Sequence, residues 1–250
     1  MTEFGRLDGR VIVVTGGASG IGQATVERCA LLGADVAIGD VPSSAGASVA
    51  EGLRANGYRV AFVPTDVTVE AQCSELMHAA IATFGKLDVL IACAGILEGA
   101  MVDVDELEDA TFQHVMDVNV RGAFLCVKHA VRVMKASGGV IILIASGAGV
   151  TGGSSSYAYG TSKAGVHGLG KVLQSRLDPS NIRVNTVCPG SIATPLKIRN
   201  IEDVARTQRG GAAMAAQAKD KLGDPEGVAR VLAFLASPDA AYVRGTIFTR

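Results

Sequence analysis

The stretch VIVVTGGASGIGQATVERCALLGA, residues 11–34, decides the fold of this chain. It opens with four β-branched residues and ends in a helical pattern, and between them Gly16, Gly20 and Gly22 follow a G-x-x-x-G-x-G spacing. Glycine allows a tight turn and lets the backbone approach an anion, and a helix start offers unpaired N–H groups and a positive dipole end. A strand, a glycine turn and a helix in this order predict a binding site for the pyrophosphate of a dinucleotide.

Six further apolar runs follow, at 35–40 (DVAIGD), 59–63 (RVAFV), 87–92 (LDVLIA), 140–145 (VIILIA), 182–187 (IRVNTV) and 245–249 (GTIFT). Their hydrophobicity is nearly continuous, which is typical of strands covered on both faces of a parallel sheet. Segments with helical spacing, among them 20–32, 69–84 and 225–236, separate these runs. The pattern predicts one α/β domain over residues 1–250, with a doubly wound (Rossmann-like), seven-stranded parallel sheet and helices on both faces.

The least regular stretch runs from residue 189 to 223, after the sixth predicted strand, and contains Gly210 and Gly211. Open sheets bind ligands outside the carboxyl ends of their strands. We therefore expect a mobile flap over the site here, and an ordinary surface loop is the alternative.

Composition excludes several classes of function. The chain has 250 residues, of which 48% are hydrophobic and 19% charged, and its formal net charge is -1. It lacks the basic balance that nucleic acids or anionic membranes attract, and no apolar run approaches the roughly 20 residues of a membrane-spanning helix. The N-terminus has no apolar signal core. Five cysteines without a CxxC pair predict free, buried thiols in a reducing compartment, so we expect a cytoplasmic protein.

Asp40 ends the second predicted strand about 20 residues after the glycines. A carboxylate at this place accepts hydrogen bonds from an adenosine ribose and repels a 2′-phosphate. The turn itself carries Ala18 and Ser19 rather than a basic residue. Both observations favour NAD over NADP, although Asp40 in a purely structural turn before Pro42 remains an alternative.

Tyr159 and Lys163, in the stretch SYAYGTSKAG (156–165), stand four residues apart. On a helix such a pair shares one face, so the phenol and the ammonium converge. A nearby positive charge lowers the pKa of a tyrosine, which is otherwise about 10, and Lys163 and an oxidised nicotinamide would both supply such a charge. Tyr159 is therefore expected to act as base in alcohol oxidation and as acid in ketone reduction.

Together, these motifs resemble the classical short-chain dehydrogenase/reductase family over nearly the whole chain. TGGASGIG (15–22) is similar to its cofactor turn, YGTSK (159–163) to its YxxxK motif, and Ser146 lies thirteen residues before Tyr159, as its catalytic serine does. Further matches are DVT at 66–68, MDVNVRGAF at 116–124 and PGSIATP at 189–195.

The resemblance implies a role for each matching residue. The catalytic group would be Asn119, Ser146, Tyr159 and Lys163, with Lys163 also on the nicotinamide ribose and Asn119 holding a water of the proton relay. Asp66 would border the adenine, and Thr194 would contact the nicotinamide amide. The expected cofactor contacts are Gly16, Ser19, Gly20, Ile21, Gly22, Asp40, Asp66, Val67, Ala94, Gly95, Tyr159, Lys163, Pro189, Gly190, Ile192 and Thr194. The family also implies a homotetramer built on the Tyr159 helix and a long helix around 105–135, with a dimer as the alternative.

The sequence departs from the family at two places. It has ACAG at 92–95 where the family often has NNAG, so Cys93 replaces an asparagine that braces the sheet; a reactive thiol is the alternative for Cys93. It stops at GTIFTR, 245–250, where the family continues into a VDGG-like tail. We expect a short final strand, and fewer subunit contacts or an incomplete pocket wall.

The sequence thus predicts an NAD(H)-dependent oxidoreductase that interconverts a secondary alcohol and its ketone. A 3-oxoacyl-carrier-protein reductase, usually NADPH-dependent, and a catalytically silent binding protein are the alternatives. The expected substrate walls are 96–100, 147–151 and 191–215. Tyr157 is expected to pack or to line the substrate, His167 to lie on a helix face or interface, and His78, His114 and His129 to form no metal site.

Overall fold

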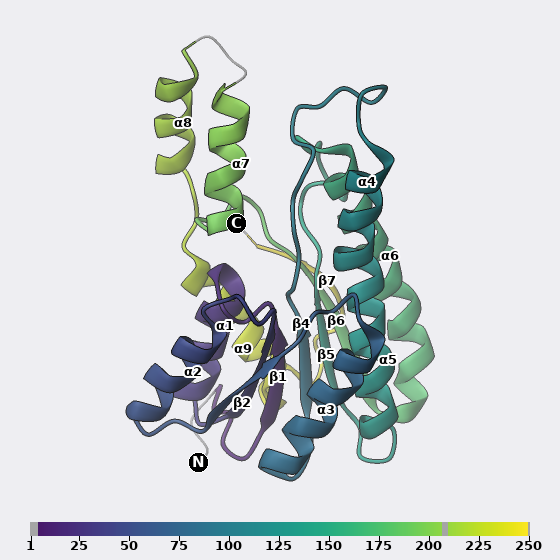
Figure 1. Ribbon diagram of the computed structural model, residues 1–250. Helices are drawn as coiled ribbons and strands as arrows, with labels where there is room; N and C mark the ends of the chain where they lie inside the picture. The colour runs from purple at the N-terminus through teal and green to yellow at the C-terminus, as the bar shows by residue number, and fades with distance from the viewer. Residues whose placement is uncertain (1–4, 207–209, 250) are drawn as a thin grey trace.

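A parallel sheet forms the centre of the molecule (Figure 1). The computed structural model describes residues 5–206 and 210–249. The sheet has the order β3-β2-β1-β4-β5-β6-β7, and all its pairings are parallel. Its strands are β1 (Val11–Thr15), β2 (Asp35–Asp40), β3 (Val60–Pro64), β4 (Val89–Ala92), β5 (Gly139–Ile144), β6 (Ile182–Cys188) and β7 (Gly245–Phe248). The predicted doubly wound sheet is confirmed, and the last strand is short, as expected.

Helices cover both faces of the sheet (Figure 1). One face packs against α1 (Gly20–Leu31), α2 (Gly46–Ala55) and α9 (Pro225–Ala236), and the other against α3 (Glu70–Phe84), α5 (Gly122–Met134) and α6 (Tyr157–Leu177). Short 3₁₀ helices span Asp178–Ser180 and Pro238–Ala240. Neighbouring residues of a strand pack into the hydrophobic cores on opposite faces of the sheet: Ile12 and Val14 lie in one core and Val13 lies in the other. This explains the nearly continuous apolar runs of the central strands, because both faces of β1, β4 and β6 are buried.

The long helix expected around 105–135 begins later and is interrupted. It starts as α4 (Asp109–Met116), passes through one π-helical turn at Asp117–Arg121, and continues as α5. A π turn inserts an extra residue into the helical repeat and is frequent at functional sites. Asn119 lies in this turn.

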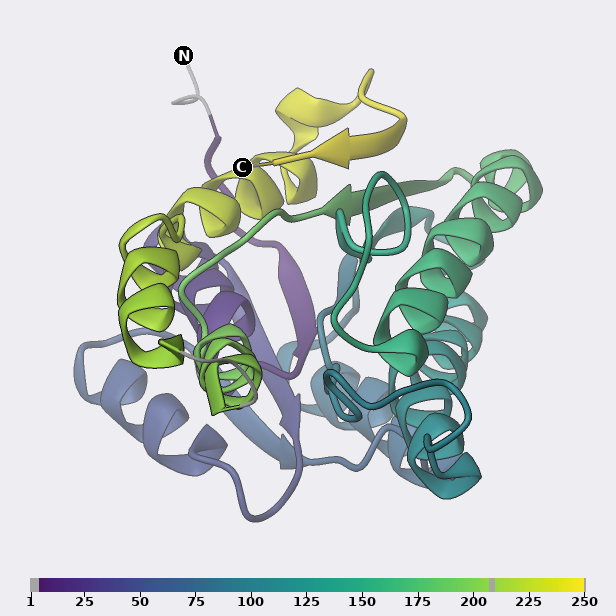
Figure 2. The ribbon, with the colours of Figure 1, turned by 90° about the horizontal axis from the view of Figure 1, so that it is seen from above.

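The sheet reverses its direction of growth between β1 and β4, so the crevice at their carboxyl ends is the expected ligand site of such a fold. The segment 189–223 stands over this edge, as Figures 1 and 2 show. Its prediction as irregular chain was wrong, because it contains two helices, α7 (Pro195–Arg206) and α8 (Gly211–Asp220). Residues 207–209 lie outside the described part, and the mobility of the flap stays a prediction.

The base of the flap is closed by two backbone hydrogen bonds. The Ala193 N–H donates to the Gly223 carbonyl at 2.8 Å, and the Gly223 N–H donates to the Ser191 carbonyl at 2.8 Å. The two ends of the flap are thereby tied together beside the sheet, and both flap helices rise from this point.

All five cysteines are free; four are buried and Cys93 is half-buried. The expectation of free, buried thiols is confirmed for Cys29, Cys73, Cys126 and Cys188. Among the helices that the structure describes, none is both long and apolar enough to span a bilayer.

Candidate active site

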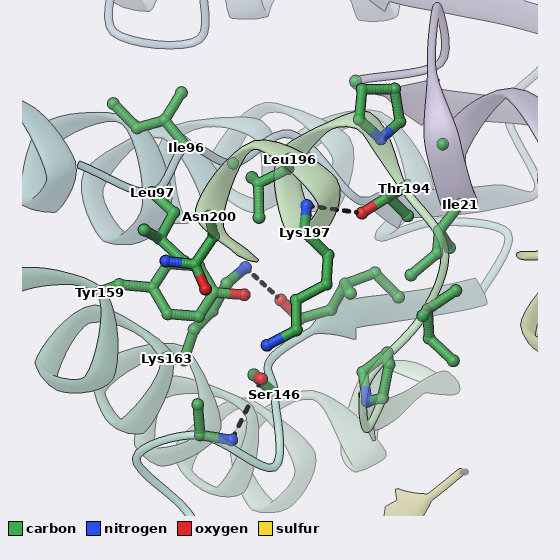
Figure 3. Close-up of a pocket in the computed structure, with 18 of the residues that line it drawn as sticks. Ile21, Ile96, Leu97, Ser146, Tyr159, Lys163, Thr194, Leu196, Lys197 and Asn200 are labelled. Carbon is green, nitrogen blue, oxygen red and sulfur yellow. Dashed lines mark hydrogen bonds between the residues drawn. The ribbon is translucent and has the colours of Figure 1, made fainter. Parts of the chain in front are cut away.

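A pocket with a volume of about 950 Å³ lies at the carboxyl edge of the sheet. The glycine turn, the ends of β2 and β4, the segments after β3, β5 and β6, and both flap helices contribute to its wall. Figure 3 shows side chains from α6, the β5 loop and α7 directed into it. The volume is at the upper end of small-molecule sites, which suits a cofactor together with a substrate.

The glycine turn is packed too closely for side chains. Gly16 has a positive φ of 67°, and a Cβ atom there would lie 2.7 Å from the Ala94 Cα. A Cβ on Gly22 would clash with the carbonyl oxygen of Gly16. Ser19 is the N-cap of α1, yet its side chain accepts no hydrogen bond from that helix. The first N–H groups of α1 and the Ser19 hydroxyl are therefore positioned as donors for a pyrophosphate.

Asp40 is fixed beside this turn. Its Oδ2 accepts a hydrogen bond from the Ala18 N–H at 3.0 Å, and its Oδ1 accepts one from the Val41 N–H at 2.8 Å. Asp66, which follows β3, accepts hydrogen bonds from the N–H and the hydroxyl of Thr68 at 2.9 Å and 2.7 Å. Both carboxylates line the pocket next to the glycine turn, where the adenosine half of a dinucleotide fits.

Tyr159 and Lys163 project from the first turns of α6. Ser156 caps this helix, since its hydroxyl accepts a hydrogen bond from the Tyr159 N–H at 3.1 Å and donates one to the Glu98 carbonyl at 2.6 Å. Tyr159 and Lys163 both point into the pocket, near Ser146 from the β5 loop (Figure 3). The Lys163 ammonium lies 5.7 Å from the centroid of the Tyr159 ring and donates a hydrogen bond to the Ile144 carbonyl at 2.9 Å.

Burial shifts the pKa values of both Tyr159 and Lys163. Burial raises the pKa of Tyr159, and a hydrogen bond with the Ser146 side chain opposes this rise. Burial also lowers the pKa of Lys163 to about 8. Desolvation thus disfavours the charged forms of both side chains in the chain alone. The lower Tyr159 pKa expected from Lys163 together with an oxidised nicotinamide stays a prediction for the cofactor-bound protein.

Asn119 is buried beside the site rather than in the pocket wall. Its Oδ1 accepts a hydrogen bond from the Ile96 N–H at 2.8 Å. Its Nδ2 donates to the Ile96 carbonyl at 2.9 Å and to the Ser162 hydroxyl at 2.8 Å. The side chain thus ties the loop after β4 to α6, and its predicted role in holding a water stays a prediction.

The other predicted residues are brought together. Every expected cofactor contact lines the pocket, as do Ser146, Tyr159 and Lys163. Thr194 stands against the glycine turn, since a Cβ on Gly20 would lie 3.0 Å from its Cγ2. The Cys93 thiol also lines the pocket, but burial raises its pKa to about 11, which argues against a reactive thiolate. In place of the missing asparagine, the Thr15 hydroxyl accepts hydrogen bonds from the N–H groups of Cys93 and Ala94 at 3.2 and 3.3 Å.

The substrate walls differ in part from the expected ones. After β4 only Ile96 and Leu97 of the stretch 96–100 line the pocket, and after β5 the wall extends to Ser155. Sequence reasoning missed His114, Asp117 and Val118 as wall residues. The expected stretch 191–215 does line the pocket, although its individual side chains were not singled out; they include Lys197, Asn200, Ile201, Val204 and Met214. The spacing of 197, 200, 201 and 204 is that of one helix face, a signal that the polar composition of this segment obscured.

Two other aromatic and histidine side chains stand apart from the site. Tyr157 is 53% exposed and does not line the pocket, so its predicted packing or substrate role was wrong. His167 lies on α6 and its Nε2 is 2.9 Å from the Thr246 hydroxyl of β7, a helix-face contact as expected. Across residues 5–206 and 210–249, no group of His, Cys, Asp and Glu residues has the arrangement of a metal site.

Comparison with known proteins adds independent findings. A family model described as short chain dehydrogenase matches residues 10–205. The chain is 44% identical over 239 residues to cis-4-hydroxycyclohexanecarboxylate dehydrogenase of Sinomonas cyclohexanicum, and this alignment covers 95% of this chain and 93% of that protein. It is 38% identical to (+)-borneol dehydrogenase 2 of Salvia officinalis, over 96% and 87%. The crystal structure of levodione reductase matches with a TM-score of 0.90 at 30% identity, over 97% of this chain and 96% of that one.

Proposed function

The chain belongs to the short-chain dehydrogenase family, and from this premise we propose that it is an NAD(H)-dependent enzyme that interconverts a secondary alcohol and its ketone. Membership makes it an oxidoreductase of a small molecule. The observation that carries the finer assignment is the meeting of Ser146, Tyr159 and Lys163 in the same pocket as the glycine turn and Asp40.

In this proposal Tyr159 is the general acid/base. The nicotinamide, when bound, supplies the hydride chemistry and, in its oxidised form, a positive charge. In ketone reduction the Tyr159 hydroxyl, whose raised pKa keeps it protonated, donates its proton to the substrate oxygen. In alcohol oxidation the Tyr159 phenolate takes the proton of the substrate hydroxyl. The phenolate form requires positive charge nearby, and Lys163 contributes part of that charge. The Ser146 hydroxyl hydrogen-bonds the same substrate oxygen and stabilises the charge that develops there.

Asp40 supports NAD rather than NADP as the cofactor. Its carboxylate is held beside the glycine turn by the N–H groups of Ala18 and Val41, at the place of the adenosine ribose. It would accept hydrogen bonds from ribose hydroxyls and would repel a 2′-phosphate. A clear preference for NADPH would instead favour the 3-oxoacyl-carrier-protein reductase alternative.

We propose a ring-bearing secondary alcohol as the substrate. The name of the relative from Sinomonas cyclohexanicum places a hydroxyl on a cyclohexane ring. The substrate end of this pocket has the apolar lining that such a ring needs, from Ile96, Leu97, Leu196 and Ile201. Apolar walls with a few polar groups are typical of small-molecule sites.

Self-association through α5 and α6, as a homotetramer or dimer, is part of the proposal. Phe124 on α5 and Val172 on α6 are 47% and 56% exposed, and a shallow apolar groove including Met116, Phe124 and Leu169 lies on this side. Light scattering of the purified protein tests the assembly. A cytoplasmic location is proposed from the free thiols.

The decisive experiment replaces Tyr159 by phenylalanine. NAD reduction is followed across a panel of ring secondary alcohols, with Tyr157→Phe as the matched control because Tyr157 is exposed outside the pocket. We expect Tyr159→Phe to lower kcat by about 10²- to 10⁴-fold, the usual contribution of a general acid/base, while NADH still binds. Equal turnover of both variants would refute the catalytic assignment of Tyr159. An inactive parent chain would favour the silent binding protein.

A further inference from the structure

Helix α7 directs one cation toward the catalytic end of the pocket. Lys197 lies in the first turn of α7, and its side chain extends toward Ser146 and Tyr159, away from Ile21 of the glycine turn (Figure 3). Its backbone N–H donates a hydrogen bond to the Thr194 hydroxyl at 3.1 Å, which fixes the root of the side chain. None of the hydrogen bonds or ion pairs found between described residues involves its ammonium.

Positive charge is not neutralised at this end of the pocket. The first turn of α7 carries no acidic residue, and the helix dipole makes this turn an unfavourable place for a lysine. In the described wall of the pocket the carboxylates are Asp40, Asp66 and Asp117. Asp40 and Asp66 flank the glycine turn. Asp117 lies in the π turn, and the end of this turn packs against Val67, which is next to Asp66 in the chain. The ammonium therefore faces a region that favours an external anion.

Asn200 holds this face of α7 in place. Its Nδ2 donates a hydrogen bond to the Ser155 hydroxyl at 2.8 Å, and the side chain is buried. Because Ser155 lies just before the cap of α6, this bond joins the flap to the loop that precedes Tyr159. Lys197 is one helical turn before Asn200, so the same contact keeps its ammonium over the catalytic end.

We propose that Lys197 selects substrates that carry a carboxylate on an apolar ring, with the carboxylate bound to its ammonium and the reacting hydroxyl at Ser146 and Tyr159. The apolar body would contact Leu97 and Leu196, which line the same pocket (Figure 3). This inference rests on the proposed function, since it names the substrate class of the same site. A partly desolvated ion pair with hydrogen bonds is worth about ten- to a hundredfold in binding.

Binding without turnover provides the first test. Cyclohexanecarboxylate and cyclohexanecarboxamide, which lack a reacting hydroxyl, are titrated into the protein with saturating NADH and followed by calorimetry. We expect the acid to bind about ten- to a hundredfold tighter than the amide to the parent chain and to Arg199→Met, the matched control from the exposed side of α7. In Lys197→Met the preference should disappear, and in Lys197→Arg most of it should remain.

Three results would overturn the inference: equal affinities for acid and amide in the parent chain, an unchanged preference in Lys197→Met, or no binding of either compound. A fourth is a loss of NADH affinity in Lys197→Met with no change in the acid preference, which would assign the ammonium to a cofactor phosphate. The proposed function fails separately, when the parent chain reduces NAD with none of the ring alcohols or when Tyr159→Phe keeps the turnover of the parent chain. The acid preference can be present or absent in either case, so the two failures are distinguishable.

Discussion

Replacing Gly22 by alanine is the most direct test of the packed glycine turn. A Cβ at this position would clash with the Gly16 carbonyl oxygen and would lie 2.8 Å from the Gly16 carbonyl carbon and 3.1 Å from the Gly17 Cα. These are backbone atoms, so the turn itself must shift. Overpacking of this kind costs about 1–3 kcal/mol, and the better helix propensity of alanine returns about 1 kcal/mol. We expect a net loss of up to about 2 kcal/mol in the free energy of unfolding.

Gly52→Ala is the matched control. Gly52 also lies in a helix, α2, but no atom lies within 4 Å of its added Cβ. Here only the propensity term acts, so the protein should gain about 1 kcal/mol. In a domain of this size 1 kcal/mol corresponds to about 2–4 °C in Tm, so the two variants should move in opposite directions.

Thermal unfolding and NADH titration complete this test. The shifted turn should also displace the N–H groups that face the pyrophosphate, so Gly22→Ala should bind NADH more weakly, whereas Gly52→Ala should bind it normally. If Gly22→Ala matched the parent chain in both Tm and NADH affinity, the close-packed turn would not be what holds the cofactor.

Three further predictions concern individual side chains. The pKa of Lys163 falls from 10.5 to about 8 on folding, so the unfolded chain binds more protons between these pH values and the free energy of unfolding should rise with pH across this window. In urea unfolding, the parent chain should gain about 2 kcal/mol over Lys163→Met from pH 8 to 10, and parallel pH profiles of the two proteins would contradict this. Asp40→Ala should raise KM for NAD by about ten- to a hundredfold and bring it closer to KM for NADP. If steady-state kinetics gave an unchanged ratio of the two KM values, Asp40 would have no part in cofactor selection. Burial lowers the pKa of Arg183 to about 10, and its guanidinium donates hydrogen bonds to the Asn185 side chain at 2.7 Å and the Leu235 carbonyl at 2.6 Å. Arg183→Met should lower the free energy of unfolding by about 2 kcal/mol without changing KM, and a variant as stable as the parent chain would show that these hydrogen bonds contribute little.

The cofactor half of the site could be predicted from the sequence because its signals are local. Gly16, Asp40, Ala94 and Pro189 each stand at or within a few residues of a strand end. In a parallel sheet all those ends share one edge, so linear positions translate directly into a common site. The glycine spacing further specifies a turn that only glycine can form, which required no knowledge of distant contacts.

The substrate half could not be predicted in the same way. The segment 189–223 is polar along the chain, and its two helices acquire an inner face only where α7 lies over the pocket. Whether Lys197 faced solvent or Tyr159 depended on this packing and on the bond between Asn200 and Ser155. Asn119 is a similar case, since the π turn and two distant partners direct its side chain toward Ile96 and Ser162.

By itself, then, the sequence determined the order of strands and helices, the close-packed glycine turn, and the pairing of a phenol with an ammonium four residues later. These features depend on residues close together in the chain, where periodicity and spacing carry the information. Only the tertiary structure decided the protonation of Tyr159 and Lys163 and the direction of Lys197. Desolvation and charge balance depend on which distant segments exclude water from a group, and in the chain alone burial raises the pKa of Tyr159.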